Sequence, residues 1–250
     1  MDATEGTKGR TALVTGASSG IGAATVRALA GAGYRTVAAA RRVERCRELA
    51  AEVGGEAIAL DVTDPASVET LKEALPEVDV VVHSAGGALG LELVAEANEA
   101  KWLEMFETNV LGVERVTKAL LPALERGSGG HIVVIGSVAG VEVYPGGAGY
   151  TAAKHAVNAL TRTLRLELLG KPIRVTEVAP GLVETEFSLV RFEGDEEKAT
   201  KVYEGIKPLS AEDVAETIAF VVTRPAHVNI DYLAVKPTAQ ATARDVHREG

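Results

Sequence analysis

Short apolar runs alternate with amphipathic helical patterns along nearly the whole chain of 250 residues. This alternation predicts strands that each lead into a helix, and such units assemble into a parallel sheet with helices on both faces. The predicted strands cover residues 11–15, 34–40, 56–60, 79–82, 131–135, 173–179 and 230–235. The sequence shows no internal repeat or linker. It therefore predicts one α/β domain over residues 1–250, a doubly wound parallel sheet of the Rossmann type.

Between these strands the sequence predicts helices over residues 23–32, 44–53, 65–75, 96–124, 150–170 and 211–222, with Asp64 and Ser210 as N-caps of the third and the last. Three segments fall outside the alternation. Residues 1–9 form a polar lead, residues from about 186 to 208 are polar and charged, and the tail from residue 236 is polar. The middle segment is expected to form a flexible flap.

The composition argues against several functional classes. The chain has 26 Lys and Arg against 35 Asp and Glu, and the resulting net charge of −9 disfavours a nucleic-acid surface. Its start lacks the apolar run of a signal peptide, and no run approaches the roughly 18 apolar residues needed to cross a bilayer. One cysteine, Cys46, cannot form an internal disulfide. We expect a soluble cytoplasmic protein that has neither nucleic-acid nor membrane partners.

A glycine-rich turn joins the first predicted strand to the first helix. It reads Gly16-Ala-Ser-Ser-Gly-Ile-Gly22, with glycines spaced GxxxGxG and not GxGxxG. Glycines let the backbone approach a pyrophosphate, and a helix N-terminus adds amides and partial positive charge. The alternative is that the glycines only permit a tight strand-to-helix turn. The surrounding strand and helix favour a nucleotide.

Two arginines, Arg41 and Arg42, follow the second predicted strand. In a dinucleotide-binding fold, an acid near this point binds the ribose 2′-hydroxyl, whereas arginine accommodates a 2′-phosphate. The alternative is a pair of solvated charges at the start of the next helix. We favour NADP over NAD.

Polar and glycine residues recur where predicted strands end, and ligands of such sheets bind at the carboxyl ends of the strands. These positions are Gly16, Arg41, Asp61, Ser84, Ser137 and Gly181. Their convergence predicts one site at that edge of the sheet.

Tyr150 and Lys154 stand four residues apart at the start of a long amphipathic run. In a helix they lie on one face, where a lysine ammonium favours the phenolate and eases proton exchange by a hydroxyl whose ordinary pKa is about 10. The alternative is an ordinary helix face with a half-buried Tyr and a solvated Lys. Asn109 lies inside another predicted helix, although asparagine is a poor helix former. It is expected either to mark a hydrogen-bonded kink or to be exposed. His83 is taken as structural.

These residues together resemble the short-chain dehydrogenase/reductase family over about residues 11–238. The motifs in order are Thr15-Gly-Ala-Ser-Ser-Gly-Ile-Gly22, Asp61-Val62, Ala85-Gly86, Asn109, Ser137, Tyr150-x-x-x-Lys154 and Pro180-Gly181. The resemblance implies an NAD(P)-dependent oxidoreductase. One departure is His83-Ser84, where the family usually has two asparagines.

The resemblance also implies a role for each matching residue. Tyr150 would be the general acid/base, and Ser137 would hydrogen-bond the substrate oxygen. Lys154 would hold the nicotinamide ribose and depress the Tyr150 pKa, while Asn109 would anchor a water in a proton relay. Asp61 and Val62 would lie at the adenine, with Val183 and Thr185 at the carboxamide.

The residues expected to contact the cofactor come from every part of the chain. They are Gly16, Ser18, Ser19, Gly20, Ile21, Gly22, Arg41, Arg42, Asp61, Val62, Ser84, Gly86, Tyr150, Lys154, Pro180, Gly181, Val183 and Thr185. No residue is predicted to bind a metal.

A closer resemblance lies in the second half of the chain, in residues 180–187, 190–192 and 225–230. These segments look like those of NADP-dependent 3-hydroxy acid dehydrogenases, which act on serine, 3-hydroxyisobutyrate and similar small acids. Arg191 is the candidate cation for the substrate carboxylate, beside Ser137 and Tyr150. The alternative is a solvated Arg191 paired with Glu193 or Asp195.

The sequence thus predicts reversible hydride transfer between NADP(H) and a small 3-hydroxy acid or a related hydroxy or carbonyl compound. One alternative is the same chemistry on a 3-oxoacyl thioester or a cyclic ketone. A second is a nucleotide-sensing binding protein without turnover. The family resemblance further implies a homo-oligomer, commonly a tetramer, formed through the helices that carry Asn109 and Tyr150.

Overall fold

The structure is a computed structural model that describes residues 7, 9–127 and 129–249. In this part of the chain seven parallel strands form one sheet in the order β3-β2-β1-β4-β5-β6-β7. The strands are β1 (Thr11–Thr15), β2 (Arg35–Ala40), β3 (Glu56–Ala59), β4 (Val80–His83), β5 (Gly130–Ile135), β6 (Ile173–Pro180) and β7 (Tyr232–Val235). The predicted doubly wound parallel sheet is confirmed. The predicted lead, 1–9, lies outside the described residues except for Thr7 and Gly9.

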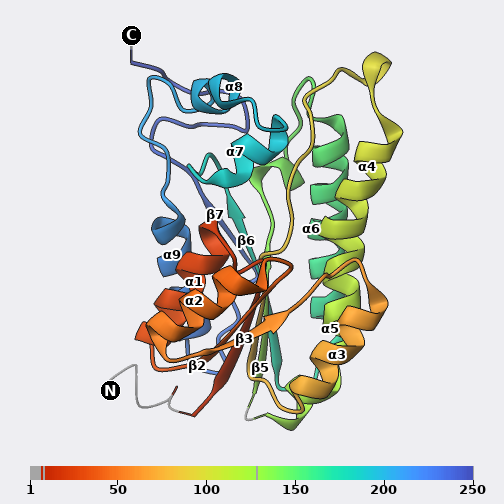
Figure 1. The fold of residues 1–250 in the computed structure, drawn as a ribbon, viewed down its shortest axis with the longest axis vertical. Coiled ribbons are helices and arrows are strands. Elements are labelled where there is room, and N and C mark those ends of the chain that lie inside the picture. The colour runs from red at the N-terminus through yellow and green to blue at the C-terminus, as the bar shows by residue number, and fades with distance from the viewer. Residues whose placement is uncertain (1–6, 8, 128, 250) are drawn as a thin grey trace.

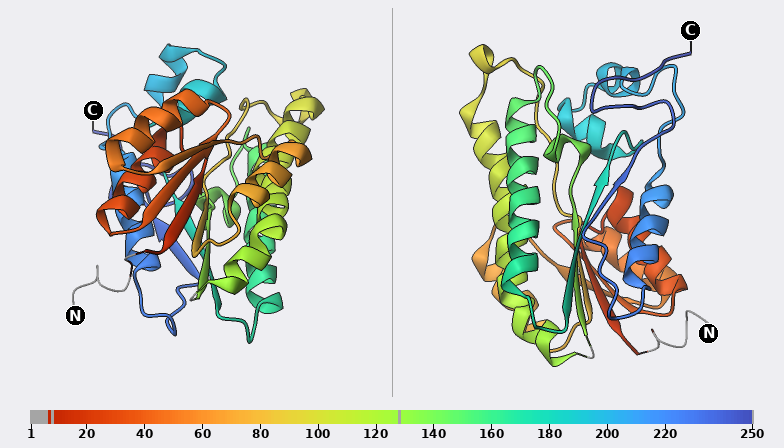
Figure 2. Two further views of the ribbon diagram at one scale, coloured as in Figure 1. Left: turned by 60° about the horizontal axis from the view of Figure 1, so that its bottom comes forward. Right: turned by 180° about the vertical axis from the view of Figure 1, so that it is seen from behind.

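Helices cover both faces of the sheet (Figures 1 and 2). One face carries α1 (Gly20–Gly31), α2 (Val43–Val53) and α9 (Ala211–Val222), and the other carries α3 (Pro65–Ala74), α5 (Gly112–Arg126) and α6 (Ala148–Glu167). The sheet has a hydrophobic core on each face, because its strands are apolar on both sides. Val26, Leu49 and Ile218 are buried in the first core, and Leu71, Leu120 and Val157 in the second.

The helix predicted over residues 96–124 is present from Glu99 onward, but it is not regular throughout. A short turn, η1 (Val94–Glu96), is followed by α4 (Glu99–Phe106), then by a π-helical turn, η2 (Glu107–Leu111), and then by α5. Asn109 lies in the π-helical turn, and such turns are frequent at functional sites. The residue that looked misplaced in a helix therefore marks the point where regular α-helical geometry is interrupted.

The segment between β6 and α9 contains two short helices, α7 (Glu186–Arg191) and α8 (Glu196–Lys201). Both lie at the top of Figure 1, beyond the carboxyl ends of the strands. The tail after β7 returns to the same edge, where the Gln240 side chain is buried and accepts a hydrogen bond from the Leu182 amide at 2.8 Å. Within the described residues, no helix is long and apolar enough to cross a membrane.

Candidate active site

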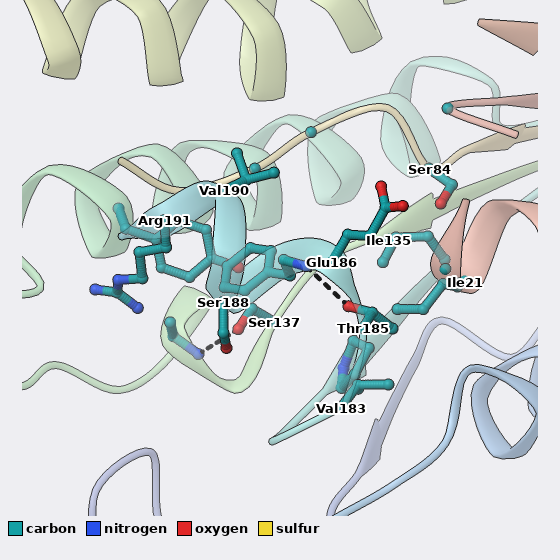
Figure 3. A pocket seen from close by; sticks show the side chains of 18 of the residues that line it. Ile21, Ser84, Ile135, Ser137, Val183, Thr185, Glu186, Ser188, Val190 and Arg191 are labelled. Carbon is teal, nitrogen blue, oxygen red and sulfur yellow. Dashed lines mark hydrogen bonds between the residues drawn. The ribbon is translucent and has the colours of Figure 1, made fainter. Parts of the chain in front are cut away.

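A cleft with a volume of about 820 Å³ opens at the carboxyl edge of the sheet. Its walls come from the turns after β1 to β6, the start of α6, the flap helix α7 and the C-terminal tail. In the close view of Figure 3, Ile21 and Ser84 lie at one end of this cleft and Arg191 at the other, with Ser137 nearer to Arg191. The volume suits a ligand larger than a simple metabolite.

The glycine-rich turn brings the ends of β1 and β4 into backbone contact. Gly16 has φ of +67°, and a Cβ placed there would be 2.7 Å from the backbone of Ala85. At Gly22 a Cβ would be 2.4 Å from the Gly16 carbonyl oxygen. Ser19 precedes α1, and its side chain makes no capping hydrogen bond to the helix. The first residues of α1, Gly20 to Gly22, line the cleft. The turn therefore has the form of a phosphate cradle.

Arg42 joins this turn to the flap. Its guanidinium donates to the Ser18 hydroxyl at 3.1 Å, to the Ser19 hydroxyl at 2.7 Å and to the Glu186 carboxylate at 2.9 Å. Arg45 donates to the other oxygen of Glu186 at 2.8 Å. These pairs lower the pKa of Glu186, with Arg45 as the largest cause. The arginine expected at a 2′-phosphate thus lies beside the turn, in contact with both serines.

The ends of β3 and β4 supply the next part of the wall. Asp61 accepts from both the amide and the hydroxyl of Thr63, at 2.9 and 2.7 Å, and these bonds lower its pKa. The Ser84 amide donates to the Thr15 hydroxyl at 3.2 Å. His83 points away into the core, where it lies 3.0 Å from the Thr117 hydroxyl and burial lowers its pKa to about 4. It is structural, as expected.

Asn109 is buried and fixes the backbone after β4. Its side-chain amide donates to the carbonyls of Gly87 and Met105, at 3.0 and 2.7 Å, and its oxygen accepts from the Gly87 amide at 3.2 Å. A Cβ at Gly86 would be 2.6 Å from that oxygen and 3.9 Å from Nζ of Lys154. Of the two alternatives for Asn109, the hydrogen-bonded irregularity is the one observed.

Ser137, Tyr150 and Lys154 meet at the centre of the cleft. Ser137 follows β5, and its hydroxyl accepts from the Ala139 amide at 3.1 Å at the start of the short turn η3 (Val138–Gly140). Lys154 Nζ lies 5.9 Å from the centre of the Tyr150 ring, as the spacing of four residues predicts. The ring also packs edge-on against Phe187 of α7, with 5.7 Å between ring centres.

The expected depression of the Tyr150 pKa by Lys154 is not found. Burial raises the pKa of Tyr150 to about 12, although the Ser137 hydroxyl and the charge of Arg191 act in the opposite direction. The Lys154 ammonium donates to the Ile135 carbonyl at 2.9 Å, and burial lowers its own pKa to about 8. Desolvation is the largest cause, and Lys154 is not among the groups that shift the Tyr150 pKa.

Arg191 does not pair with either of the acids in its own segment. Glu193 pairs with Lys101 at 2.9 Å and Asp195 with Lys198 at 2.8 Å, so the alternative of a solvated flap charge is wrong. The Arg191 side chain turns inward, and Nε donates to the Gly90 carbonyl at 3.0 Å.

The Arg191 guanidinium lies between two tyrosines. Nη1 donates to the Tyr144 hydroxyl at 3.1 Å, and the guanidinium carbon is 5.6 Å from the centre of the Tyr150 ring. Nη2 is buried, and it has no hydrogen-bond partner among the described residues. Buried donors are nearly always hydrogen-bonded, so Nη2 is available to a water molecule or to a ligand atom.

The loop after β6 closes the cleft on the remaining side. A Cβ at Gly181 would be 2.1 Å from the Gln240 side-chain oxygen, and the start of α7 faces the start of α1, since a Cβ at Gly20 would be 3.3 Å from Thr185. The Val183 carbonyl accepts from the Tyr203 hydroxyl at 2.8 Å. Thr185 caps α7 through the Phe187 amide at 3.2 Å.

All the predicted cofactor and catalytic positions except Asn109 line this cleft, and Asn109 lies directly behind Gly86 and Gly87. Sequence reasoning missed several further residues at the cleft, among them Tyr144 and Gln240, which no motif marks. Glu186 and Phe187 also line the cleft, and they fall in the segment 180–187, although no role at the site was predicted for them.

The residues present fit a dinucleotide. Glycines admit the backbone of neighbouring strands, the first turn of α1 faces the cleft, and Arg41 and Arg42 stand at the end of β2. An elongated phosphate-bearing ligand matches this series of donors and apolar walls.

The model of the short chain dehydrogenase family matches residues 10–196. An uncharacterized oxidoreductase of Mycobacterium tuberculosis is 60% identical over 240 residues, which is 96% of each chain. A protein of Escherichia coli named NADP-dependent 3-hydroxy acid dehydrogenase is 42% identical, over 95% of this chain and 99% of its own. Among solved structures, the closed form of a serine dehydrogenase complexed with NADP+ matches with a TM-score of 0.90 and 41% identity, over 96% of this chain and 100% of that one.

The chain belongs to the short chain dehydrogenase family. The match extends over both the glycine-rich turn and the residues around Tyr150 and Lys154. It is therefore an oxidoreductase of that family.

Proposed function

We propose that this oxidoreductase transfers a hydride reversibly between NADP(H) and a small 3-hydroxy acid or its carbonyl counterpart. The relatives named above support both parts of the proposal, since one carries NADP and 3-hydroxy acids in its name and another was solved with NADP+. The observation that carries the substrate class is the buried Nη2 of Arg191, which lies beside Tyr150 and lacks an acceptor in the described chain.

NADP, when bound, supplies or accepts the hydride. Gly16 to Gly22 and the first turn of α1 would hold its pyrophosphate, and Arg41 and Arg42 its 2′-phosphate. Lys154 would hold the nicotinamide ribose, close to the position where its ammonium now donates to the Ile135 carbonyl. The loop from Pro180 to Thr185 would border the nicotinamide.

Tyr150 would exchange the proton of the substrate oxygen, and the Ser137 hydroxyl would hydrogen-bond the same oxygen. Because burial raises the Tyr150 pKa to about 12, the phenol is held protonated and suits the reductive direction. For oxidation the phenolate must be favoured, and the Ser137 hydroxyl and the charge of Arg191, which both act to lower the Tyr150 pKa, would supply that bias.

Arg191 would bind the substrate carboxylate and so fix the hydroxyl next to Tyr150. A charged guanidinium with a buried Nη2 suits an anion and disfavours the apolar chain of a long acyl thioester. Tyr144 and the Gly90 carbonyl hold the guanidinium in place, and Nη2 would bind the ligand. Small acids are therefore favoured over cyclic ketones and thioesters.

A substrate panel tests this function. Reduction of NADP or NAD, followed at the absorbance band of reduced nicotinamide, would be measured with L-serine, 3-hydroxyisobutyrate and uncharged alcohols of similar size. We expect turnover of the acids with NADP well above NAD, because Arg41 and Arg42 favour a 2′-phosphate. Turnover confined to thioesters or cyclic ketones would contradict the substrate class, and tight cofactor binding without any turnover would contradict the enzyme.

We also propose a cytoplasmic homotetramer. Apolar side chains are exposed on α4, where Leu103 and Phe106 are 68% and 41% exposed, and on α6, where Leu166 is 75% exposed. Such side chains favour contact with a second copy. Sedimentation velocity should give a mass four times that of one chain, and the paired change Leu103→Glu and Phe106→Glu should reduce it. A monomer at micromolar concentration would refute the proposal.

A further inference from the structure

A carboxylate lies buried behind the catalytic lysine. Glu177 is in the middle of β6 and is only 1% exposed. One of its oxygens accepts from the Asn158 side chain at 2.8 Å, while Oε1 has no hydrogen-bond partner in the described part of the protein. Burying a carboxylate is costly unless a cation or several donors offset the loss of water. The position of Glu177 therefore needs a functional or electrostatic reason.

The backbone around Glu177 is shaped to admit it. A Cβ at Gly136 would be 2.0 Å from Oε1, so any other residue at position 136 would occupy the space of the carboxylate. A Cβ at Gly140 would be 3.7 Å from the same oxygen and 2.9 Å from the Lys154 carbonyl. Two glycines thus form a niche that places the carboxylate between β5, η3 and α6.

A cation of the proposed catalytic centre lies beside this niche. Lys154 Nζ donates to the carbonyl of Ile135, the residue directly before Gly136, so the ammonium and the Glu177 carboxylate lie next to the same peptide unit. Asn158, which binds the other oxygen, is one helical turn after Lys154 on α6. The carboxylate is therefore held by the helix that carries the lysine.

The charges of Lys154 and Glu177 each shift the pKa of the other residue. Burial lowers the pKa of Lys154 to about 8, and Glu177 acts in the opposite direction. Burial likewise raises the pKa of Glu177, while Asn158 and Lys154 oppose this change. On the other side of Glu177, Tyr232 of β7 lies in register with it. Burial raises the pKa of Tyr232, and the charge of Glu177 raises it further. Lys154 is the cation that acts on Glu177.

We propose that Glu177 is a positioning residue whose buried carboxylate keeps Lys154 charged, so that the lysine can hold the ribose hydroxyls and support proton exchange at Tyr150. The inference rests on the proposed function and extends it to a residue outside the cleft. Glu177 contacts neither the cofactor positions nor the substrate positions directly, and it acts through Lys154.

The test compares Glu177→Gln with Glu177→Asp and with the control Asp231→Asn. Asp231 is an exposed carboxylate in the segment that pairs with Glu177 through a backbone hydrogen bond, so its change removes a charge nearby but outside the niche. The pH profile of kcat/KM for NADP-dependent oxidation would be measured for each. In Glu177→Gln we expect the alkaline limb, where Lys154 loses its proton, to move down by about one pH unit.

A second readout needs no activity. Amidination of Lys154 by methyl acetimidate, followed by mass spectrometry in cofactor-free protein, reports the fraction of neutral amine at each pH. Its midpoint should fall in Glu177→Gln and stay at the wild-type value in Glu177→Asp and Asp231→Asn. This measurement tests the role of Glu177 separately from the proposed function, because Lys154 can be modified even if the wild-type enzyme oxidises no 3-hydroxy acid.

Unchanged midpoints and pH profiles in a folded Glu177→Gln protein would overturn the inference. Equal shifts in Glu177→Gln and Glu177→Asp would also overturn it, since shape and not charge would then be responsible. Thermal unfolding of each variant shows that the comparison is made on folded protein. If Glu177→Gln does not fold, the test rests on Glu177→Asp, which retains the charge. A shift in its midpoint of Lys154 amidination would then contradict the proposal.

Discussion

Tyr150→Phe should lower kcat by at least about 100-fold in both directions while the protein still folds and binds NADP, because general acid–base groups contribute about 10²- to 10⁴-fold. Phenylalanine keeps the ring that packs against Phe187 and removes only the hydroxyl. Steady-state rates and fluorescence titration with NADPH would measure the two effects separately.

The matched control is Tyr203→Phe. Tyr203 belongs to the flap and also lines the cleft, but its hydroxyl donates to the Val183 carbonyl and interacts with Ser188, which indicates a structural role. We expect Tyr203→Phe to retain most of its turnover. If Tyr150→Phe turned over like the wild type, the proton-transfer role would have to be abandoned.

Arg191→Met should lower kcat/KM for a 3-hydroxy acid by about 10- to 100-fold, because a hydrogen bond to a charged group contributes about 1.5–3 kcal/mol. The loss should fall mainly on KM, since the guanidinium binds the carboxylate in the ground state as well as in the transition state. An uncharged alcohol of similar size should be oxidised at nearly the wild-type rate. Steady-state kinetics on both substrates would give the comparison.

The uncharged alcohol separates recognition from structure. Arg191 also contacts Tyr144 and the Gly90 carbonyl, so its loss could simply disorder the flap. A disordered flap would impair both substrates equally, and that result would refute the carboxylate assignment. Arg191→Lys should fall between the two proteins, because lysine keeps the charge and loses the planar fork.

The sheet was predictable from the sequence because its signals are local. Buried parallel strands are continuous apolar runs, and each is followed by a turn and a helical pattern that periodicity reveals. The pairing of Tyr150 with Lys154 was predictable for the same reason, since helical spacing alone places them on one face. The irregularity at Asn109 was signalled by a poor helix former, and a hydrogen-bonded kink was one of two interpretations, although its π-helical form was not predicted.

The remaining features depend on contacts between distant segments. Glu177 reads as one of three polar residues in β6, and its niche exists only because Gly136 and Gly140 leave space for it. The inward turn of Arg191 depends on Tyr144, which is 47 residues away in the chain. The raised pKa of Tyr150 arises from burial, which spacing along one helix does not reveal.

Glu186 links the two halves of the molecule, since a flap residue from the second half binds Arg42 and Arg45 of the first. This link matters for protein engineering. A chimera whose first 60 residues lack Arg42 and Arg45 would leave the Glu186 carboxylate without these two counter-charges. The arginines that favour the cofactor therefore depend on a residue far away in the chain. An exchange of the first 60 residues calls for a matching change at position 186.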